Sequence, residues 1–84
     1  MDLSGAVLTE HASGQLQKRQ IAETEVRLVL NQPESVQPVR IGRVVAQALV
    51  GQHLIRVFVD IDREPAEVVT AYRTSQIAKY RRQP

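Results

Sequence analysis

The sequence predicts an α+β domain, in which an N-terminal helical hairpin packs on one face of an antiparallel sheet. Apolar residues recur at helical spacing over residues 8–31, and from residue 36 onward they alternate with polar residues. Turn signals at Gly51-Gln52 and at residues 62–65 separate the alternating segments. Because helices come first and strands follow, we expect a meandering sheet of four strands, with three as the alternative, and not a parallel sheet.

Length and composition indicate one domain over residues 1–84 with an aliphatic core. The chain has 84 residues, a net charge of +2 and three aromatic residues. It has no Cys, which excludes disulfides and thiolate metal sites. Its two histidines make a zinc site improbable, and we expect neither a metal nor a cofactor. No apolar run approaches the about 20 residues that span a bilayer, and no signal peptide is recognisable, so we expect a soluble, cytoplasmic protein without a membrane partner.

The first helix is expected over residues 10–19. Thr9 is a suitable N-cap, and Glu10 in the first turn faces the positive end of the helix dipole. An edge strand over residues 6–8 is a candidate element before it. The apolar stripe of this helix contains Leu8, Ala12 and Leu16, with Arg19 one turn further along the same stripe and His11 at its border.

The second helix is expected to begin at Ala22 or Glu23 and to end at Asn31. Asn31 and Pro33 stop it. Its buried face contains Ile21, Val26, Val29 and Leu30.

The strands are expected over residues 36–40, 43–50, 54–61 and 67–73, and a short final helix over 76–82. In the third strand the aliphatic set should face the helices. The mixed set, Leu54, Arg56, Phe58 and Asp60, should then lie on the opposite face, toward solvent or a ligand. In the last strand, Val68 and Val69 are both apolar. Placing Val69 and Ala71 inward puts Thr70 and Tyr72 on the face of Arg56.

Basic residues crowd the C-terminal end, where no acid follows Glu67. Such an end favours an anionic partner such as nucleic acid, and a solvated tail is the alternative. The residues concerned are Arg73, Lys79, Arg81 and Arg82.

Two candidate site residues lie on the first helix, with Lys18 on the same side as His11. The imidazole of His11 could act as acid or base near neutral pH, or it could be a partly buried structural residue. Arg19 on the core stripe needs a partner, which could be the C-terminal carbonyls of its own helix, a carboxylate or a bound phosphate.

Further candidates lie on the strands. Arg43 and Arg56 occupy adjacent strands of the central hairpin, where they could clamp a phosphate. Alternatively, Arg56 could form a surface ion pair with Asp60 that is worth less than about 1 kcal/mol. Tyr72 could stack on a base, donate a hydrogen bond or simply pack.

Five ordered motifs stand out along the chain: His11-Ala12, Arg19-x-Ile21, Glu25-Val26 with Pro33, Arg56-Val57-x-Val59-Asp60 and Val69-Thr70-x-Tyr72-Arg73. Together they resemble a bacterial family of small domains of unknown function, which is similar to RelE/ParE-type toxins and is grouped with the barnase–EndoU–colicin–RelE ribonuclease superfold. The resemblance covers the chain from about Leu8 to Tyr80. One departure is Ala22, where the family prefers a capping Ser.

The resemblance implies a metal-independent endoribonuclease of a toxin–antitoxin system, with RNA, including ribosome-bound mRNA, as substrate and an antitoxin as partner. The alternatives are a non-catalytic module that binds protein or nucleic acid, and a ParE-like toxin that acts on DNA gyrase. The expected catalytic residues are His11, Arg19, Arg56 and Tyr72, and the expected substrate-binding residues are Thr70, Arg43 and Lys18.

Overall fold

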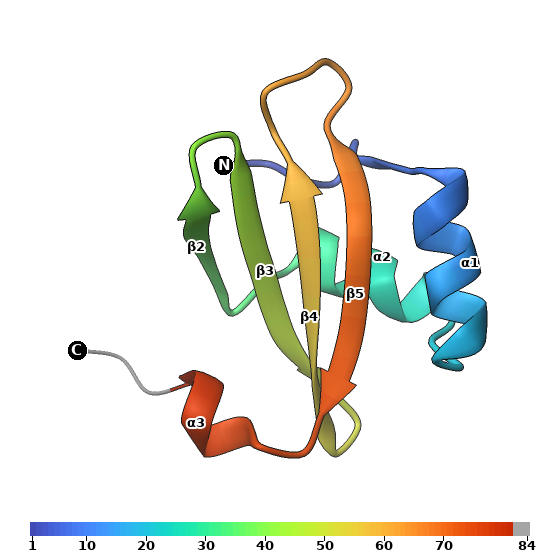
Figure 1. Cartoon of the computed structure of the whole chain (residues 1–84). Coiled ribbons are helices and arrows are strands. Elements are labelled where there is room, and N and C mark those ends of the chain that lie inside the picture. The colour runs from blue at the N-terminus through green and yellow to red at the C-terminus, as the bar shows by residue number, and fades with distance from the viewer. Residues whose placement is uncertain (82–84) are drawn as a thin grey trace.

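The computed structural model describes residues 1–81 as an α+β fold (Figure 1). Its helices are α1 (Glu10–Lys18), α2 (Glu23–Asn31) and α3 (Ile77–Arg81). Its strands are β1 (Val7–Leu8), β2 (Ser35–Arg40), β3 (Arg43–Val50), β4 (His53–Asp60) and β5 (Glu67–Thr74).

The sheet has five strands in the order β1-β5-β4-β3-β2. Strands β2 to β5 form the antiparallel meander that the sequence predicts. The expected total of four strands is wrong, because β1 pairs with β5 in parallel and adds a fifth strand at that edge. The candidate edge strand before the first helix is therefore confirmed, over Val7–Leu8.

Two helices, α1 and α2, cover one face of the sheet (Figure 1). Thr9 caps α1 as predicted, since its Oγ1 accepts a hydrogen bond of 3.0 Å from the Ala12 N–H. Ala22 offers no side-chain cap to α2, but its N–H donates to the Glu25 carboxylate at 2.9 Å. This hydrogen bond gives the Ala22 N–H at the start of α2 a partner, which it would otherwise lack within the helix.

An aliphatic core fills the space between the helices and the sheet, as the composition predicts. Each fully buried Val, Leu or Ile side chain stabilises the fold by about 1.5–3 kcal/mol. The largest of these side chains are Val26, Val29 and Leu30 from α2 and Ile55, Val57, Val59 and Val68 from the sheet, none more than 1% exposed.

A β-bulge in β5 sets which of its side chains enter the core. Val68 lies opposite Val59, but Thr70 lies opposite Phe58, so Val69 is an extra residue in the ladder. Val68 and Ala71 are therefore both fully buried, whereas Val69 is half-buried. The expectation that Val69 points inward is wrong, and the one for Ala71 is confirmed.

The sheet face opposite α1 and α2 is less exposed than the sequence predicts. Leu54 and Asp60 were expected to face solvent or a ligand, but they are 0% and 5% exposed. Asp60 is covered because two arginines bind it, as described below. Leu54 lies at the end of β4 that approaches α3, in register with Thr74 of β5.

Among residues 1–81, no helix combines the length and the apolar character needed to cross a membrane.

Two glycines provide a matched test of the backbone. Gly42 has a φ of +83°, and a Cβ there would lie 2.8 Å from Asp62 Oδ2, whereas a Cβ on helical Gly14 would meet nothing within 4 Å. We expect Gly42→Ala to lower the free energy of unfolding by about 1–2 kcal/mol. We expect Gly14→Ala to raise it by up to about 1 kcal/mol. Urea unfolding of both variants checks this, and a Gly42→Ala protein as stable as the wild type would contradict it.

Candidate functional site

The sheet face that α1 and α2 leave uncovered, here called the open face, brings several predicted site residues together. On this face Arg56 of β4 lies in register between Gln47 of β3 and Tyr72 of β5. Thr70 lies opposite Phe58 in the next row, about 7 Å along the strands. The expectation that Arg56, Thr70 and Tyr72 share a face is confirmed.

Arg56 is held by polar and aromatic partners at the same time. Its Nε donates to Gln47 Oε1 at 2.9 Å, and its Nη1 donates to the Tyr72 hydroxyl at 2.6 Å. Its Cζ lies 4.1 Å from the ring centroid of Tyr80 and 5.7 Å from those of Phe58 and Tyr72. All three aromatic residues of the chain thus surround one guanidinium, an arrangement stabilised by cation–π attraction.

The hydroxyl groups of Tyr72 and Tyr80 influence one another. Burial raises the pKa of Tyr72, and its hydrogen bond with Tyr80 raises it further, while Arg56 opposes both effects. The pKa of Tyr80 is lowered, chiefly by the hydrogen bond from Tyr72. Tyr72 therefore stays protonated at neutral pH, and its phenol can orient Arg56 or a ligand but cannot serve as a base.

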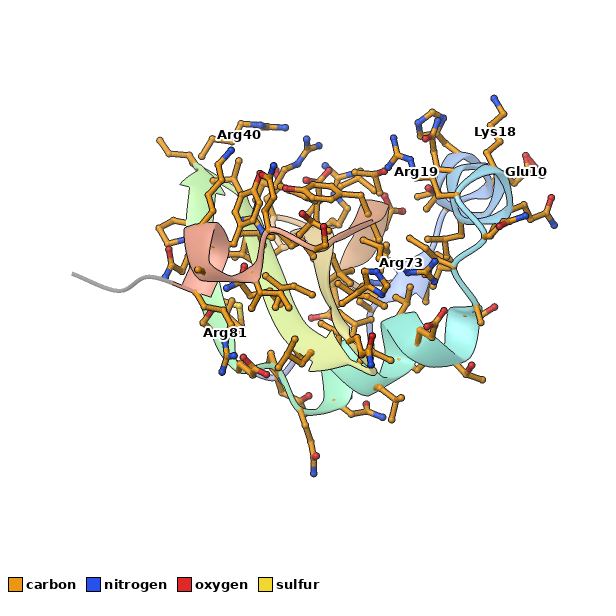
Figure 2. All side chains as sticks on the ribbon, turned by 90° about the horizontal axis from the view of Figure 1, so that it is seen from below. Glu10, Lys18, Arg19, Arg40, Arg73 and Arg81 are labelled. Atoms are coloured by element: carbon orange, nitrogen blue, oxygen red, sulfur yellow. The ribbon has the colours of Figure 1, made fainter. Side chains whose placement is uncertain are left out.

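Helix α3 lies over Arg56, on the side of the sheet opposite α2 (Figure 2). The Gln47 side chain donates to the Tyr80 carbonyl at 2.8 Å, and Arg81 Nε lies 3.1 Å from Glu34 Oε1. The final helix was expected over 76–82; it is confirmed over Ile77–Arg81, and Arg82 lies outside the described residues. Tyr80 covers one flat side of the Arg56 guanidinium, while Nη2 has no hydrogen-bond partner among residues 1–81.

Arg19 connects the end of α1 to β5. Its Nη1 donates to Thr70 Oγ1 at 3.0 Å and to the Ala71 carbonyl at 2.7 Å. Arg19 therefore binds β5 and not the C-terminal carbonyls of its own helix, which were one of the partners considered from the sequence. The guanidinium is exposed on the same side of the molecule as Arg40 (Figure 2), so it can still contact a ligand at the β5 edge of the open face.

His11 and Lys18 are exposed on α1, away from the core. His11 was expected at the border of the apolar stripe, with partial burial as one alternative, and the structure places it in solvent. It lies eight residues before Arg19, or about 12 Å along the helix axis. Neither side chain has a polar partner in the described part of the chain, so His11 is accessible but is not oriented by a neighbour.

Arg43 forms the ion pair with Asp60 that the sequence left open as one alternative for Arg56. Its Nε and Nη2 bind the two Asp60 oxygens at 2.6 and 3.2 Å, in a forked geometry. Arg63 Nη2 adds a contact of 3.5 Å. The hydrogen bond from Arg43 is the main cause that lowers the pKa of Asp60. The alternative of an Arg56–Asp60 surface pair is wrong, because Arg56 turns toward Gln47 and Tyr72.

Arg73, one of the C-terminal basic residues, turns toward the helices. Its Nη2 donates to the Gln20 carbonyl at 3.1 Å and to Glu25 Oε1 at 3.3 Å. Arg73 therefore ties β5 to the start of α2 and does not contribute to the open face.

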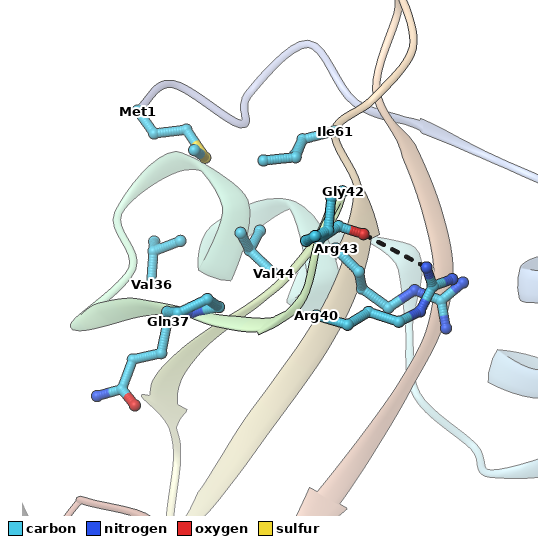
Figure 3. A pocket seen from close by; sticks show the side chains of 10 residues that line it. Met1, Val36, Gln37, Arg40, Gly42, Arg43, Val44 and Ile61 are labelled. Carbon is cyan, nitrogen blue, oxygen red and sulfur yellow. Dashed lines mark hydrogen bonds between the residues drawn. The ribbon is translucent and has the colours of Figure 1, made fainter.

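A hollow of about 540 Å³ lies at the β2–β3 hairpin, on the helix side of the sheet. The side chains around it include the apolar Val36, Val44 and Ile61, and two arginines, Arg40 and Arg43, border it and extend to one side (Figure 3).

Arg56 and the residues around its guanidinium, Gln47, Phe58, Tyr72 and Tyr80, are here called the Arg56 cluster. Sequence reasoning did not find two of them, Gln47 and Tyr80. Gln47 is 4% exposed and is the one polar residue in the run 44–50 of β3, a signal that could have drawn attention to it. Tyr80 was placed on the final helix but was not connected with Arg56. Its position depends on how α3 folds back over the sheet, which local sequence patterns do not encode.

No group of three or more His, Cys, Asp and Glu side chains comes together as a metal site within residues 1–81.

A protein-family model described as domain of unknown function (DUF4258) matches residues 8–73. No curated protein and no solved structure matches the chain significantly. The comparisons thus bear out the predicted resemblance to a domain of unknown function, and they add no support for similarity to RelE/ParE-type toxins.

The Arg43–Asp60 pair makes stability depend on pH. Because folded Asp60 has a pKa below its ordinary 3.8, the ionised carboxylate stabilises the fold above that value. This contribution is lost as the pH falls through the lowered folded pKa. We expect Asp60→Asn to cost about 2 kcal/mol at pH 7 and progressively less below pH 3.8. Urea unfolding of both proteins across this range measures the difference, and a cost that stays constant with pH would contradict the role of the charge.

Proposed function

The chain belongs to the family of domains of unknown function DUF4258, and we propose that it is a metal-independent endoribonuclease of toxin type that binds RNA across its open face. The observation that carries the proposal is the Arg56 guanidinium, fixed by Gln47 and Tyr72 with Nη2 left for a ligand. A guanidinium is always charged and binds phosphate oxygens in a fork. The aromatic rings beside it provide surfaces on which an unpaired base can stack.

The reaction that suits these residues is attack of a ribose 2′-hydroxyl on the adjacent phosphorus. The 2′-oxygen–phosphorus bond forms and the phosphorus–5′-oxygen bond breaks, which leaves a cyclic phosphate and a 5′-hydroxyl. His11 takes the 2′ proton or gives a proton to the leaving oxygen. Arg19 and Arg56 stabilise the charge that develops on the phosphate.

The remaining candidates bind and position the substrate. Thr70 and Tyr72 line the face beside Arg19 and Arg56, respectively. Tyr72 contributes a neutral phenol, in agreement with its raised pKa. Lys18 of α1 and Arg43 of β3 are assigned to contacts with more distant parts of the strand.

The five motifs resemble a family of domains of unknown function that is similar to RelE/ParE-type toxins, and this resemblance supports the same class of function. His11, Arg19, Arg56, Thr70 and Tyr72 occupy the motif positions. Within this proposal the substrate is RNA, including mRNA on the ribosome, and the partner is a neutralising antitoxin protein.

A non-catalytic binding module is the second candidate. Two observations favour it: Tyr80 already covers one side of Arg56, and no side chain within residues 1–81 orients His11. Catalytic acids and bases act within hydrogen-bond reach of the proton they move, and such a position is usually fixed by a neighbour. In this alternative the open face binds RNA or a protein without cleaving it.

Cleavage of RNA in the presence of EDTA tests the proposal. We expect His11→Ala and Arg56→Ala to lower the rate about 100-fold or more, because they remove the proton-transfer group and the phosphate contact. The matched controls are His53→Ala, which removes the exposed first residue of β4, and Arg63→Ala, which removes an exposed arginine from the loop between β4 and β5; both lie outside the Arg56 cluster. We expect both controls to cleave at the wild-type rate.

The outcomes separate the candidates. Equal cleavage by the wild type and the His11 and Arg56 variants would refute the assignment of these residues. Binding of RNA without cleavage by the wild type would favour the binding module. Inhibition of DNA supercoiling by gyrase, without RNA cleavage, would instead favour the ParE-like alternative.

A further inference from the structure

Two arginines lie directly opposite one another at the end of the β2–β3 hairpin. Arg40 of β2 pairs in register with Arg43 of β3. Both side chains extend in the same direction from the hairpin, to one side of the hollow (Figure 3). Like charges at directly opposed positions of an antiparallel pair destabilise a sheet. An arrangement of this kind is expected where a bound anion would relieve the repulsion.

The nearby carboxylates of residues 1–81 form their ion pairs with other arginines and not with Arg40. Asp60 is taken by Arg43, as described above. The two other acids at this end, Asp62 and Glu67, each accept a hydrogen bond of 3.0 Å from Arg63. Within residues 1–81, the one hydrogen bond of Arg40 is a long contact of 3.4 Å with the Ile41 carbonyl, and the side chain is exposed. In this part of the chain one guanidinium is thus left without a carboxylate within ion-pair distance, beside a second one that Asp60 holds in a fork.

The hairpin end is also tied to its neighbours by hydrogen bonds, which favours a preorganised site. The Ile61 N–H donates to the Gly42 carbonyl at 2.9 Å, so the turn is fixed to the end of β4. Asp60 binds Nε and Nη2 of Arg43, and within residues 1–81 the Nη1 group has no hydrogen-bond partner. A guanidinium held along one edge presents its other edge in a fixed direction.

We infer that Arg40 and Arg43 together bind one backbone phosphate of the nucleic acid, at the β2 side of the open face. This inference rests on the proposal that RNA lies across this face. Asp60, opposite Arg43, is four residues from Arg56 on β4, or about 13 Å. The pair is therefore too far from Arg56 to touch the same phosphate, and it contributes to binding of the strand and not to the chemical step.

The test is binding of a fluorescently labelled 2′-O-methyl oligouridine, measured by anisotropy over a series of salt concentrations. This probe has no 2′-hydroxyl and cannot be cleaved by the proposed reaction. Each phosphate contact to a single strand adds about 0.7 to the slope of log affinity against log salt. We expect Arg40→Gln to reduce the slope by about 0.7 and to weaken binding several-fold at low salt. Arg63→Gln is the matched control, because Asp62 and Glu67 already neutralise Arg63, and we expect it to keep the wild-type slope.

Equal slopes for the wild type and Arg40→Gln would overturn the phosphate site, as would an equal loss in Arg63→Gln, which would indicate a general effect of net charge. Failure of the wild type to bind the oligouridine would overturn it as well. The result is independent of catalysis. If the wild type does not cleave RNA but Arg40→Gln shows the reduced slope, the nuclease proposal fails and the phosphate site stands.

Discussion

The bulge at Val69 is the constraint on which the open face depends. Side chains alternate strictly along a regular strand, so an inward Val68 would place Thr70 and Tyr72 inward too, under the helices. The extra residue shifts the register by one, and Val68 and Ala71 both enter the core. Thr70 and Tyr72 consequently lie opposite Phe58 and Arg56 on the other face. Bulges redirect side chains in this way at the functional edges of many sheets.

The Arg56 cluster follows from that register. Once Tyr72 lies opposite Arg56, its hydroxyl accepts the 2.6 Å hydrogen bond, and its ring joins those of Phe58 and Tyr80 around the guanidinium. The core below is aliphatic, so all the aromatic side chains of the chain are used on the open face. Burying part of a permanent charge is costly unless it is hydrogen-bonded, and Gln47 and Tyr72 meet that need while leaving Nη2 unbonded within residues 1–81. The same contacts that make Arg56 tolerable in the fold also fix it for a phosphate.

The sequence predicts much of the fold, because the fold depends on periodicity and caps. Thr9 caps α1, and alternation identifies β2 to β5. The shared face of Arg56 and Tyr72 follows from alternation once Ala71 is placed inward, although alternation alone does not reveal the bulge that also buries Val68. What the sequence does not predict depends on contacts between distant residues. The bulge depends on how Val68 fits against the core. Whether Asp60 pairs with Arg43 or with Arg56 depends on which arginine lies closer in the folded sheet. The position of Tyr80 depends on how α3 folds back over the sheet. Gln47, a buried amide between apolar neighbours, was visible in the sequence as an anomaly but could not be given a partner there.

The claim that RNA lies across the open face is tested most directly by NMR titration with the 2′-O-methyl oligouridine. The reporters are the Arg56 Nε–H group, the Thr70 and Tyr72 amides, and, on the opposite side of the sheet, the exposed α2 residue Leu28. We expect the shifts of Arg56, Thr70 and Tyr72 to change in a saturable manner, while Leu28 stays unchanged. Changes confined to α2, with the open-face signals unmoved, would contradict the proposed binding surface.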